Sequence, residues 1–309
     1  MNHLSRRSFV QLASLSALAL NLPIEAEQSR IVLPVDLCGR WGYIDNKGAL
    51  AIPARYTAAV PFASDWAAVR RDGLWGYINR SGKETLKPQF QEARNFFWNC
   101  SPVRTGNEWH YIRPDGKDAF PERYVTARSF QDERARVVIN GKWGFLSPDG
   151  KIAIQAKYDN ANGYNEGVAP VVLGDKWGFI NKAGATVIPF RYAKAASFSG
   201  GLCAVQIDGK WGFIRHDGSI GLPVVWEDTG DFSEGLCPVK KDGLWGLINA
   251  SGNIVLKPQY QQMDSFADGF VLVKEDNQSI YLDHSFKAIW KQNMDCPAGS
   301  LVKQYKQPH

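Results

Sequence analysis

The 309-residue sequence lacks the short motifs by which many enzymes are recognised. It contains no Gly-x-Ser-x-Gly elbow, no His-Glu-x-x-His, no phosphate-binding glycine loop and no calcium-loop pattern. Histidine is scarce, and His110, His216, His284 and His309 stand at no metal-ligand spacing from one another or from a cysteine. The sequence therefore predicts a protein that is not an enzyme, with no catalytic residue, no metal and no cofactor.

Charge of one sign is not concentrated in any part of the chain. Lys and Arg number 36 against 31 Asp and Glu, a formal net charge of +5. Proteins that bind nucleic acid gather basic residues in a patch or run, so a nucleic-acid partner is not expected. Asp115, Asp149 and Asp217 each precede a glycine in a predicted turn, which explains them without a functional role.

Long apolar runs are also missing. The mild apolar stretch at residues 12–22 is too short and too rich in Ala and Ser to anchor in a bilayer. It follows Arg6 and Arg7, in an Arg-Arg-x-Phe string that resembles a twin-arginine signal. Residues 1–26 are thus predicted to be an export signal, with the general secretory route or an untidy N-terminal helix as alternatives. No lipid-accepting cysteine follows, which favours a soluble periplasmic product without an integral membrane span.

Tryptophan, in contrast, is abundant and regular. Seven tryptophans recur at a spacing of 34 residues without insertion or deletion: Trp41, Trp75, Trp109, Trp143, Trp177, Trp211 and Trp245. Six of them precede glycine, and the exception precedes His110. A fixed period of this length is the mark of a repeat protein.

Each repeat contains a pattern typical of an antiparallel meander. A short apolar strand comes first, as at residues 202–205, and an Asp-Gly or Asn-Gly pair suited to a type I′ turn follows. The Trp-Gly strand comes next, then a glycine turn and a third strand. The connection to the next repeat carries two aromatics six residues apart, as at Tyr192 and Phe198. This spacing leaves a helical turn, an irregular connection and a strand open.

The alternation of side chains along a strand gives both faces of the Trp-Gly strand an apolar character. The Trp and the following aromatic share one face, and the Gly and the Ile share the other. The glycine leaves a notch, which we expect the Trp or a connector aromatic of the neighbouring repeat to fill. The tryptophans are accordingly interpreted as packing residues and not as a repeated ligand site.

A degenerate eighth copy follows the seven intact ones. Ser279 stands where the Trp belongs and Phe286 where the turn glycine belongs. The loss of the motif is expected of a capping unit that has no further neighbour. We predict an all-β domain over residues 27–290 and a C-terminal tail at 291–309. Seven or eight units apolar on both faces predict a propeller-like ring, with an open curved β-solenoid as the alternative.

The strings Lys142-Trp143-Gly144-Phe145, Lys176-Trp177-Gly178-Phe179 and Lys210-Trp211-Gly212-Phe213 resemble the WG-containing, or KWG, repeat family. The resemblance covers roughly residues 31–290. It implies an all-β bacterial repeat protein, often exported and without an established chemical activity. The function expected is a non-enzymatic binding or scaffold role in the bacterial cell envelope, with an envelope protein or a glycan as partner. The alternative is a periplasmic, hydrolase-like enzyme with its site in a groove or channel formed by the repeat turns.

Two sets of residues are candidates for a binding surface, because exposed slots that vary between copies are free to serve function. Lys142, Lys176 and Lys210 occupy the slot before the Trp in successive repeats and could form a basic ladder. The favoured interpretation is that they are solvated lysines which protect a strand edge. Phe97 and Trp98 follow Phe96 directly. Exposed, they would form a binding patch, and buried, they would be a local variation of the core.

The five cysteines are odd in number and include no Cys-x-x-Cys. Cys203 and Cys237 lie one period apart and could approach disulfide range if the repeats stack closely in an oxidising compartment. The favoured alternative is that each is a small buried residue at a slot that holds alanine in other copies.

Overall fold

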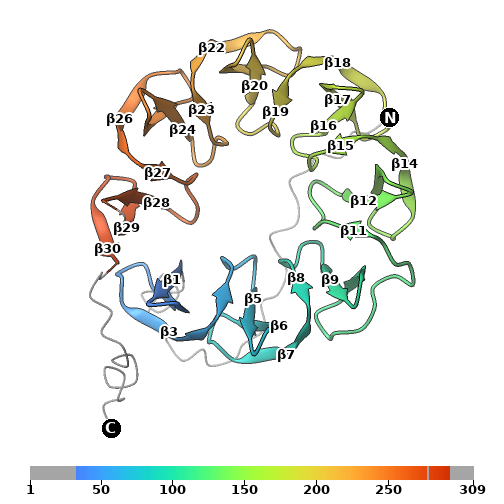
Figure 1. The fold of residues 1–309 in the computed structure, drawn as a ribbon, viewed down its shortest axis with the longest axis vertical. Helices are drawn as coiled ribbons and strands as arrows, with labels where there is room; N and C mark the ends of the chain where they lie inside the picture. The colour runs from blue at the N-terminus through green and yellow to red at the C-terminus, as the bar shows by residue number, and fades with distance from the viewer. Residues whose placement is uncertain (1–32, 277, 293–309) are drawn as a thin grey trace, which may run out of the picture.

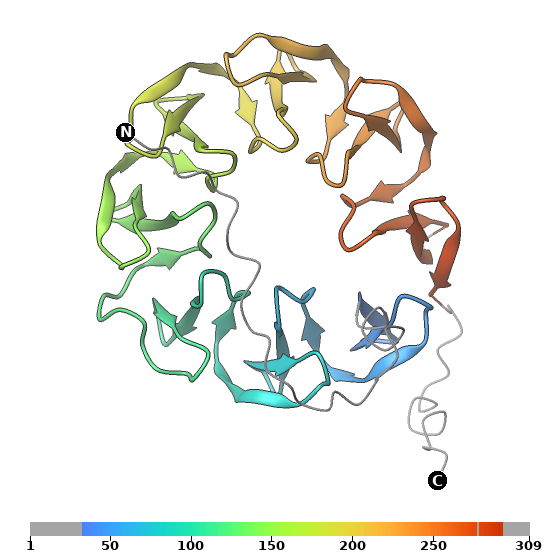
Figure 2. The ribbon, with the colours of Figure 1, turned by 180° about the vertical axis from the view of Figure 1, so that it is seen from behind.

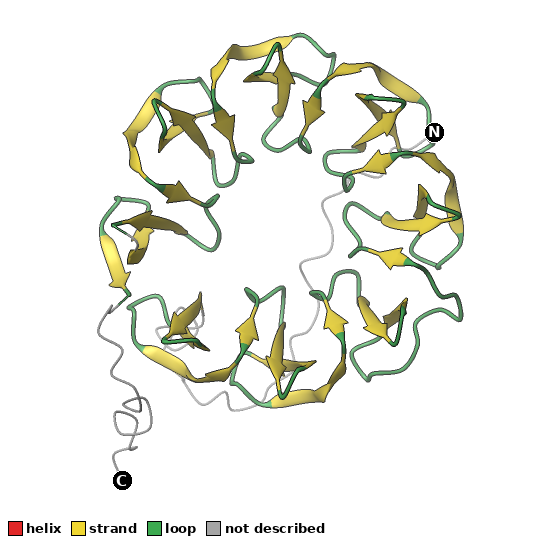
Figure 3. Ribbon diagram, in the orientation of Figure 1, coloured by secondary structure: helices red, strands yellow, loops and turns green. Residues whose placement is uncertain are grey.

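The computed structural model describes residues 33–276 and 278–292 as eight small antiparallel sheets arranged in a ring (Figure 1). Figure 2 shows the ring from behind, and Figure 3 shows strands and loops with no helix in the described part of the chain. The predicted all-β ring is thereby confirmed, and the open solenoid is wrong. The predicted export signal and all but two residues of the predicted tail lie outside the described residues.

Each sheet, here called a blade, is ordered from the inside of the ring outward. Short inner strands are β4 (Ala58–Ala59), β8 (Glu92–Ala93), β11 (Thr126–Ala127), β15 (Asn160–Ala161), β19 (Lys194–Ala195), β23 (Asp228–Thr229) and β27 (Gln262–Met263). Second strands are β1 (Leu33–Leu37), β5 (Trp66–Arg71), β9 (Ser101–Thr105), β12 (Ala135–Ile139), β16 (Val168–Leu173), β20 (Cys203–Ile207), β24 (Leu236–Lys241) and β28 (Phe270–Glu275).

The third strands carry the Trp-Gly pair or its substitute. They are β2 (Arg40–Ile44), β6 (Leu74–Asn79), β10 (Glu108–Ile112), β13 (Lys142–Leu146), β17 (Lys176–Asn181), β21 (Lys210–Ile214), β25 (Leu244–Asn249) and β29 (Gln278–Asp283). Outer strands are β3 (Leu50–Tyr56), β7 (Glu84–Phe90), β14 (Ile152–Tyr158), β18 (Thr186–Tyr192), β22 (Ile220–Trp226), β26 (Ile254–Tyr260) and β30 (Ala288–Lys291). Blade 1 is β1 to β3, blade 2 is β4 to β7, blade 3 is β8 to β10, and blades 4 to 8 follow with four strands each.

The hairpin turns form as their sequences predict. Asp72 and Gly73, between β5 and β6, have φ values of 53° and 81°, which a type I′ turn requires at both central positions. The second turn closes with Gly82 at φ 79°, whose N–H donates to the carbonyl of Asn79 at 2.8 Å. The turn residues thus fix the meander that each blade needs.

The connection between blades contains a short strand, which resolves the choice that the aromatic spacing left open. Tyr192 ends the outer strand β18 of blade 5, Ala195 belongs to the inner strand β19 of blade 6, and Phe198 follows in the next loop. Tyr192 and Phe198 are 3% and 0% exposed. Each period of the sequence therefore closes one blade and opens the next.

The notch beside each Trp-Gly glycine is filled differently from our expectation. A Cβ on Gly42 would lie 2.6 Å from the carbonyl oxygen of Ile52 and 2.8 Å from the amide nitrogen of Ala54. Both atoms belong to the outer strand β3 of the same blade. The outer strand bulges across the Trp-Gly strand, because its register shifts between the pairs Trp41–Tyr56 and Tyr43–Ile52. The expected filling by an aromatic of the neighbouring repeat is therefore wrong.

Neighbouring blades pack face to face through the aromatic that follows the glycine. Tyr43 is fully buried, its ring lies 5.0 Å from that of Phe62, and Ile78 of blade 2 belongs to the same apolar cluster. The Tyr43 hydroxyl donates to the carbonyl of Val60 at 2.9 Å. Trp41 is only half-buried at the side of this cluster. The aromatic face of one blade thus covers the isoleucine face of the next.

The eighth copy closes the ring, which corrects its interpretation as a cap without a further neighbour. Tyr281 packs with Leu33 and Ile44 of blade 1, and its hydroxyl donates to the carbonyl of Pro34 at 3.0 Å. In the described residues no strand is shared between blades 1 and 8. Ser279, in the slot of the missing Trp, lines a cavity of about 50 Å³ at this seam.

Cys203 and Cys237 are free and buried, so the disulfide between them does not form. Each thiol donates within its own blade, Cys203 to the carbonyl of Ala196 at 3.2 Å and Cys237 to that of Gly230 at 3.3 Å. The interpretation as small buried residues is confirmed. The described residues contain no helix that could cross a membrane.

Candidate functional site

Blade 3 is the one blade of the described ring in which a Trp-Gly strand or its equivalent is followed by no outer strand. Its strand β10 meets the following segment only at two isolated bridges, Trp109 with Tyr124 and Ile112 with Asp118. The spacing from Trp109 to Tyr124 equals that from Trp41 to Tyr56, so no insertion explains the difference. The cause must lie in the residues themselves.

His110 supplies that cause, because it replaces the glycine over which the outer strand crosses in the regular blades. In blade 5 a Cβ on Gly178 would already lie 2.9 Å from the backbone oxygen of Ile188. An imidazole in this slot takes the space of the crossing strand, and residues 118–124 run outside the regular sheet. His110 itself is 9% exposed.

Both nitrogens of His110 have polar partners. The Nδ1 atom lies 2.7 Å from Oδ1 of Asp118, and the Nε2 atom lies 3.2 Å from the hydroxyl of Thr105. Arg123 donates to the other oxygen of Asp118 at 2.6 Å. Burial raises the pKa of Asp118, but hydrogen bonds from Arg123 and His110 outweigh burial and hold that pKa below its usual value. Asp118 is therefore a carboxylate at neutral pH and orients the imidazole.

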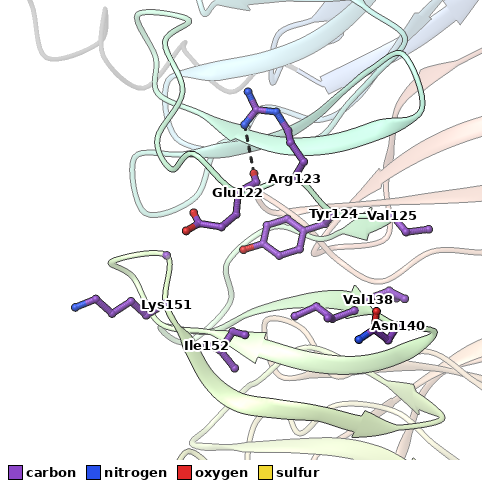
Figure 4. A pocket seen from close by; sticks show the side chains of 10 residues that line it. Glu122, Arg123, Tyr124, Val125, Val138, Asn140, Lys151 and Ile152 are labelled. Atoms are coloured by element: carbon purple, nitrogen blue, oxygen red, sulfur yellow. Dashed lines mark hydrogen bonds between the residues drawn. The ribbon is translucent and has the colours of Figure 1, made fainter.

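The displaced segment borders a pocket of about 550 Å³ between blades 3 and 4 (Figure 4). Its lining consists of Glu122, Arg123, Tyr124, Val125, Val138, Ile139, Asn140, Gly150, Lys151 and Ile152. In Figure 4 the Tyr124 ring lies between the two blades, and Glu122 and Lys151 lie at one end of the pocket. Val125 and Ile152 are 72% and 46% exposed. The volume is within the range of small-ligand sites, which are mostly apolar with a few polar groups.

The loop after β8 exposes the two aromatics that the sequence singled out. Phe97 and Trp98 are 42% and 57% exposed, whereas the adjacent Phe96 and Cys100 are buried at 2% and 5%. Backbone hydrogen bonds between Phe97 and Cys100 close the loop at 3.0 and 3.1 Å, and Trp98 adopts a positive φ of 51°. Of the two interpretations offered for this segment, exposure is the one that holds.

Trp98 occupies a slot that in blades 4, 5 and 7 carries a carboxylate joining two blades. Glu166 of blade 5 lies 2.9 Å from Nε2 of His216 and accepts from the N–H of Gly201, both in blade 6. Glu234 binds His284 in the same way at 2.7 Å, and Asp132 binds Lys182 at 2.6 Å. His216, which lies in the turn after β21, therefore joins blade 6 to blade 5.

The predicted lysine ladder is partly neutralised. Lys142 is paired with Asp159, and Lys176 lies 3.9 Å from a carboxylate oxygen of Asp175. Lys210 is exposed and has no ion pair among the described residues. The three lysines start β13, β17 and β21 of successive blades. The pairing of Lys142 and Lys176 and the exposure of Lys210 support the interpretation as surface lysines, and a role as a ladder stays a prediction.

His110 is a site residue that the sequence analysis does not predict, although His110 breaks the Trp-Gly pattern. The signal was available, since His110 alone replaces glycine among the seven regular copies. No second histidine or cysteine stands at a metal-ligand spacing from His110, so the sequence alone gives His110 no chemical role. Its partners are Thr105, at the end of strand β9, and Asp118, in the displaced segment, and no spacing within the repeat motif links them to His110.

Eight antiparallel blades closed face to face define the protein as a β-propeller. The model of the WG containing repeat family matches residues 41–75, 75–109, 111–143, 143–177, 177–211, 211–245 and 245–278. The chain belongs to this family, and the matched segments skip residue 110.

Solved structures of low sequence identity share this fold. The dihydro-heme d1 dehydrogenase NirN is 13% identical, with a TM-score of 0.58 over 85% of this chain and 73% of its own. A eukaryotic initiation factor is 9% identical, with a TM-score of 0.53 and coverages of 84% and 83%. BamB from Moraxella catarrhalis is 10% identical, with a TM-score of 0.50 and coverages of 87% and 96%. These likenesses show the fold alone, and no curated protein sequence matches the chain.

Proposed function

We propose that this WG-repeat propeller is an exported, non-enzymatic binding or scaffold protein of the bacterial cell envelope, which holds its partner at blade 3. One observation carries the proposal, namely the exposure of Phe97 and Trp98 at 42% and 57% on a loop closed by backbone hydrogen bonds. Exposed aromatics of this size are enriched among the residues that dominate binding energy. A loop already fixed in shape loses little entropy when a partner binds.

The expected partner is an envelope protein or a glycan, because both present apolar surface that an indole ring can cover. The other exposed large apolar side chains of the described residues are aliphatic, for example Val187 and Val225 on the outer strands of blades 5 and 6. Those two residues provide a matched control for exposure without aromatic character.

The binding test compares the double variant Phe97→Ser, Trp98→Ser with the control Val187→Ser, Val225→Ser. Each full-length protein is used to capture partners from an envelope extract, with and without protease treatment of the extract. The captured component is then purified and titrated against both variants. We expect the aromatic variant to bind at least about tenfold more weakly, equivalent to about 1.4 kcal/mol. Equal binding by the two variants would contradict the proposal.

Export is supported by the Arg6-Arg7 string and by Cys38, which is disulfide-bonded. Disulfides persist in oxidising compartments and are rare in the cytosol. The test replaces Arg6 and Arg7 by lysine and measures the protein in periplasmic and cytoplasmic fractions. We expect the variant to be retained in the cytoplasm. Periplasmic protein at wild-type level in this variant would exclude the twin-arginine route.

Hydrolysis is a second candidate function, because Thr105, His110 and Asp118 are connected as hydroxyl, imidazole and carboxylate. In acyl-transfer enzymes this order lets the imidazole take the hydroxyl proton as the oxygen attacks a carbonyl. A fluorophosphonate probe tests it. If hydrolysis is the function, the probe should label the wild type and the control variant Thr57→Ala. It should not label Thr105→Ala. Absence of label from the wild type removes the candidate.

A further inference from the structure

Two arginines face each other across neighbouring strand segments of blade 4. The backbone N–H of Arg128 donates to the carbonyl of Arg136 at 3.0 Å, just beyond the short strand β11. The same hydrogen bond recurs in the blades around the ring and defines one repeated pair of slots. Its other occupants are Val60 with Ala68, Arg94 with Pro102, Asn162 with Pro170, Ala196 with Ala204, Gly230 with Pro238 and Asp264 with Leu272.

Blade 4 is therefore the only described blade that places two like charges in this pair. Like charges directly opposite each other on a sheet are destabilising. Burial and then the charge of Arg128 lower the pKa of Arg136 to about 10. No carboxylate forms an ion pair with either arginine in the described part of the chain. The fold maintains this repulsion without an internal counter-charge.

The guanidinium of Arg136 is also incompletely hydrogen-bonded. Its Nη1 atom donates to the carbonyl of Ala161 and to Oδ1 of Asn162, both in blade 5, whereas its Nε atom is buried and has no acceptor. A buried donor without a partner costs free energy and calls for an explanation. Four arginine Nε atoms among the described residues are buried and have no acceptor, and all four belong to blades 3 and 4. They are those of Arg94, Arg104, Arg134 and Arg136.

We infer that Arg128 and Arg136, with Asn162 as a positioning residue, form a binding site for an oxyanion at the inner end of the seam between blades 4 and 5. Guanidinium groups bind phosphate and carboxylate oxygens through paired, charge-assisted hydrogen bonds. An oxyanion between the two arginines removes their repulsion. Arg136 also lies over the ring of Trp143, at 5.9 Å, which holds its side chain against blade 4. The site goes beyond the proposed role of the Phe97 loop and does not depend on it.

The experiment measures binding to the full-length protein by isothermal titration at constant ionic strength. Inorganic phosphate and an oligogalacturonate, which carries carboxylates and no phosphate, are the two probes. The variant is Arg128→Gln, because the Arg128 side chain forms no ion pair among the described residues, and the control is Arg70→Gln at an exposed position of blade 2. We expect the wild type and R70Q to bind at least one probe, and R128Q to bind it at least about tenfold more weakly.

The preferred probe identifies the source of the oxyanion, phosphoryl group or carboxylated glycan. A second readout separates binding from structure, since ligand-free R128Q should melt at the wild-type temperature or above it. Arg128→Lys, which keeps the charge and loses the planar fork, should bind with intermediate affinity. Failure of both probes to bind the wild type, or equal binding by R128Q and R70Q, overturns the proposal. These outcomes leave the role of Phe97 and Trp98 untouched.

Discussion

Blades 3 and 5 are built from repeats of equal length, yet only blade 5 completes its sheet. In blade 5 the outer strand β18 crosses Gly178 and pairs with the Trp-Gly strand. In blade 3 His110 occupies the crossing point, and residues 122–124 of the corresponding segment border a pocket instead. The comparison teaches that one side chain at the glycine slot decides whether a repeat is a plain structural unit or an open one.

The two sectors also differ at slots that packing does not fix. Blades 5 and 6 are joined by Glu166 and His216, whereas blade 3 exposes Trp98 in the carboxylate slot. Blade 4 opposes Arg128 and Arg136 where blade 6 opposes two alanines. These departures lie in blades 3 and 4, which form the sector with candidate binding features, and blades 5 and 6 form the regular sector used for comparison.

The largest effect is expected when histidine replaces the glycine of a regular blade, which tests whether this slot decides if the outer strand pairs. Gly178→His should destabilise the protein by about 3 kcal/mol, because the new side chain overlaps the outer strand at Ile188 and the ring of Phe190. Chemical denaturation measures the change. A loss below about 1 kcal/mol would show that any blade tolerates histidine and that blade 3 is not special.

The reverse change sharpens the comparison. His110→Gly should let residues 118–124 pair with β10 and close the pocket, because the crossing point becomes free. Hydrogen exchange of the amides in this segment should slow by at least about tenfold, or about 1.4 kcal/mol of local opening free energy. Exchange that is unchanged, with the overall fold intact, would place the cause of the displacement elsewhere in the segment.

The carboxylates that join regular blades should matter less than the glycine slot. Glu166→Gln weakens the contact with His216 and the acceptor for Gly201, at a position that is partly open to solvent. We expect a loss of about 1 kcal/mol in the free energy of unfolding. Glu108→Gln, an exposed carboxylate at the start of β10, serves as the control and should change stability by less than half as much. Equal losses of stability in Glu166→Gln and Glu108→Gln would contradict the role of Glu166 in joining blades 5 and 6.

The smallest effect concerns the pH dependence of blade 3. Because the folded-state pKa of Asp118 is depressed, its contribution to stability is present above its unfolded value near 3.8 and is lost as the pH falls through the folded value. Asp118 is partly exposed, so the contribution is below about 1 kcal/mol. The stability difference between wild type and Asp118→Asn should shrink as the pH falls below about pH 4. A difference that grows below about pH 4 would reverse this sign.

Much of the fold could be predicted from local sequence, because the Asp-Gly turns, the Trp-Gly strand and the 34-residue period all reflect short-range chemistry. That the outer strand fills the glycine notch could not be predicted, because this contact depends on a register shift between two strands. The period of the sequence carries no information about such a shift. The closing contact of Tyr281 with Pro34 joins residues 247 apart, and no local pattern announces it. For the site, the exposure of Phe97 depends on how its loop folds, which the sequence does not show. The sequence does show that His110 replaces the glycine, but it does not show that the outer strand is missing there as a result.

The contact between Tyr281 and blade 1 closes the ring with the same kind of bond that other seams contain, from a tyrosine hydroxyl to a backbone carbonyl of the next blade. Tyr281 donates to Pro34 of strand β1, whereas Tyr43 donates to Val60 just after β4, and no described strand ties the two end blades together. The order of the repeats along the chain is then a matter of where the polypeptide starts, and not of how the ring is held. A circularly permuted gene that begins between Tyr192 and Lys194 would encode the same set of seams.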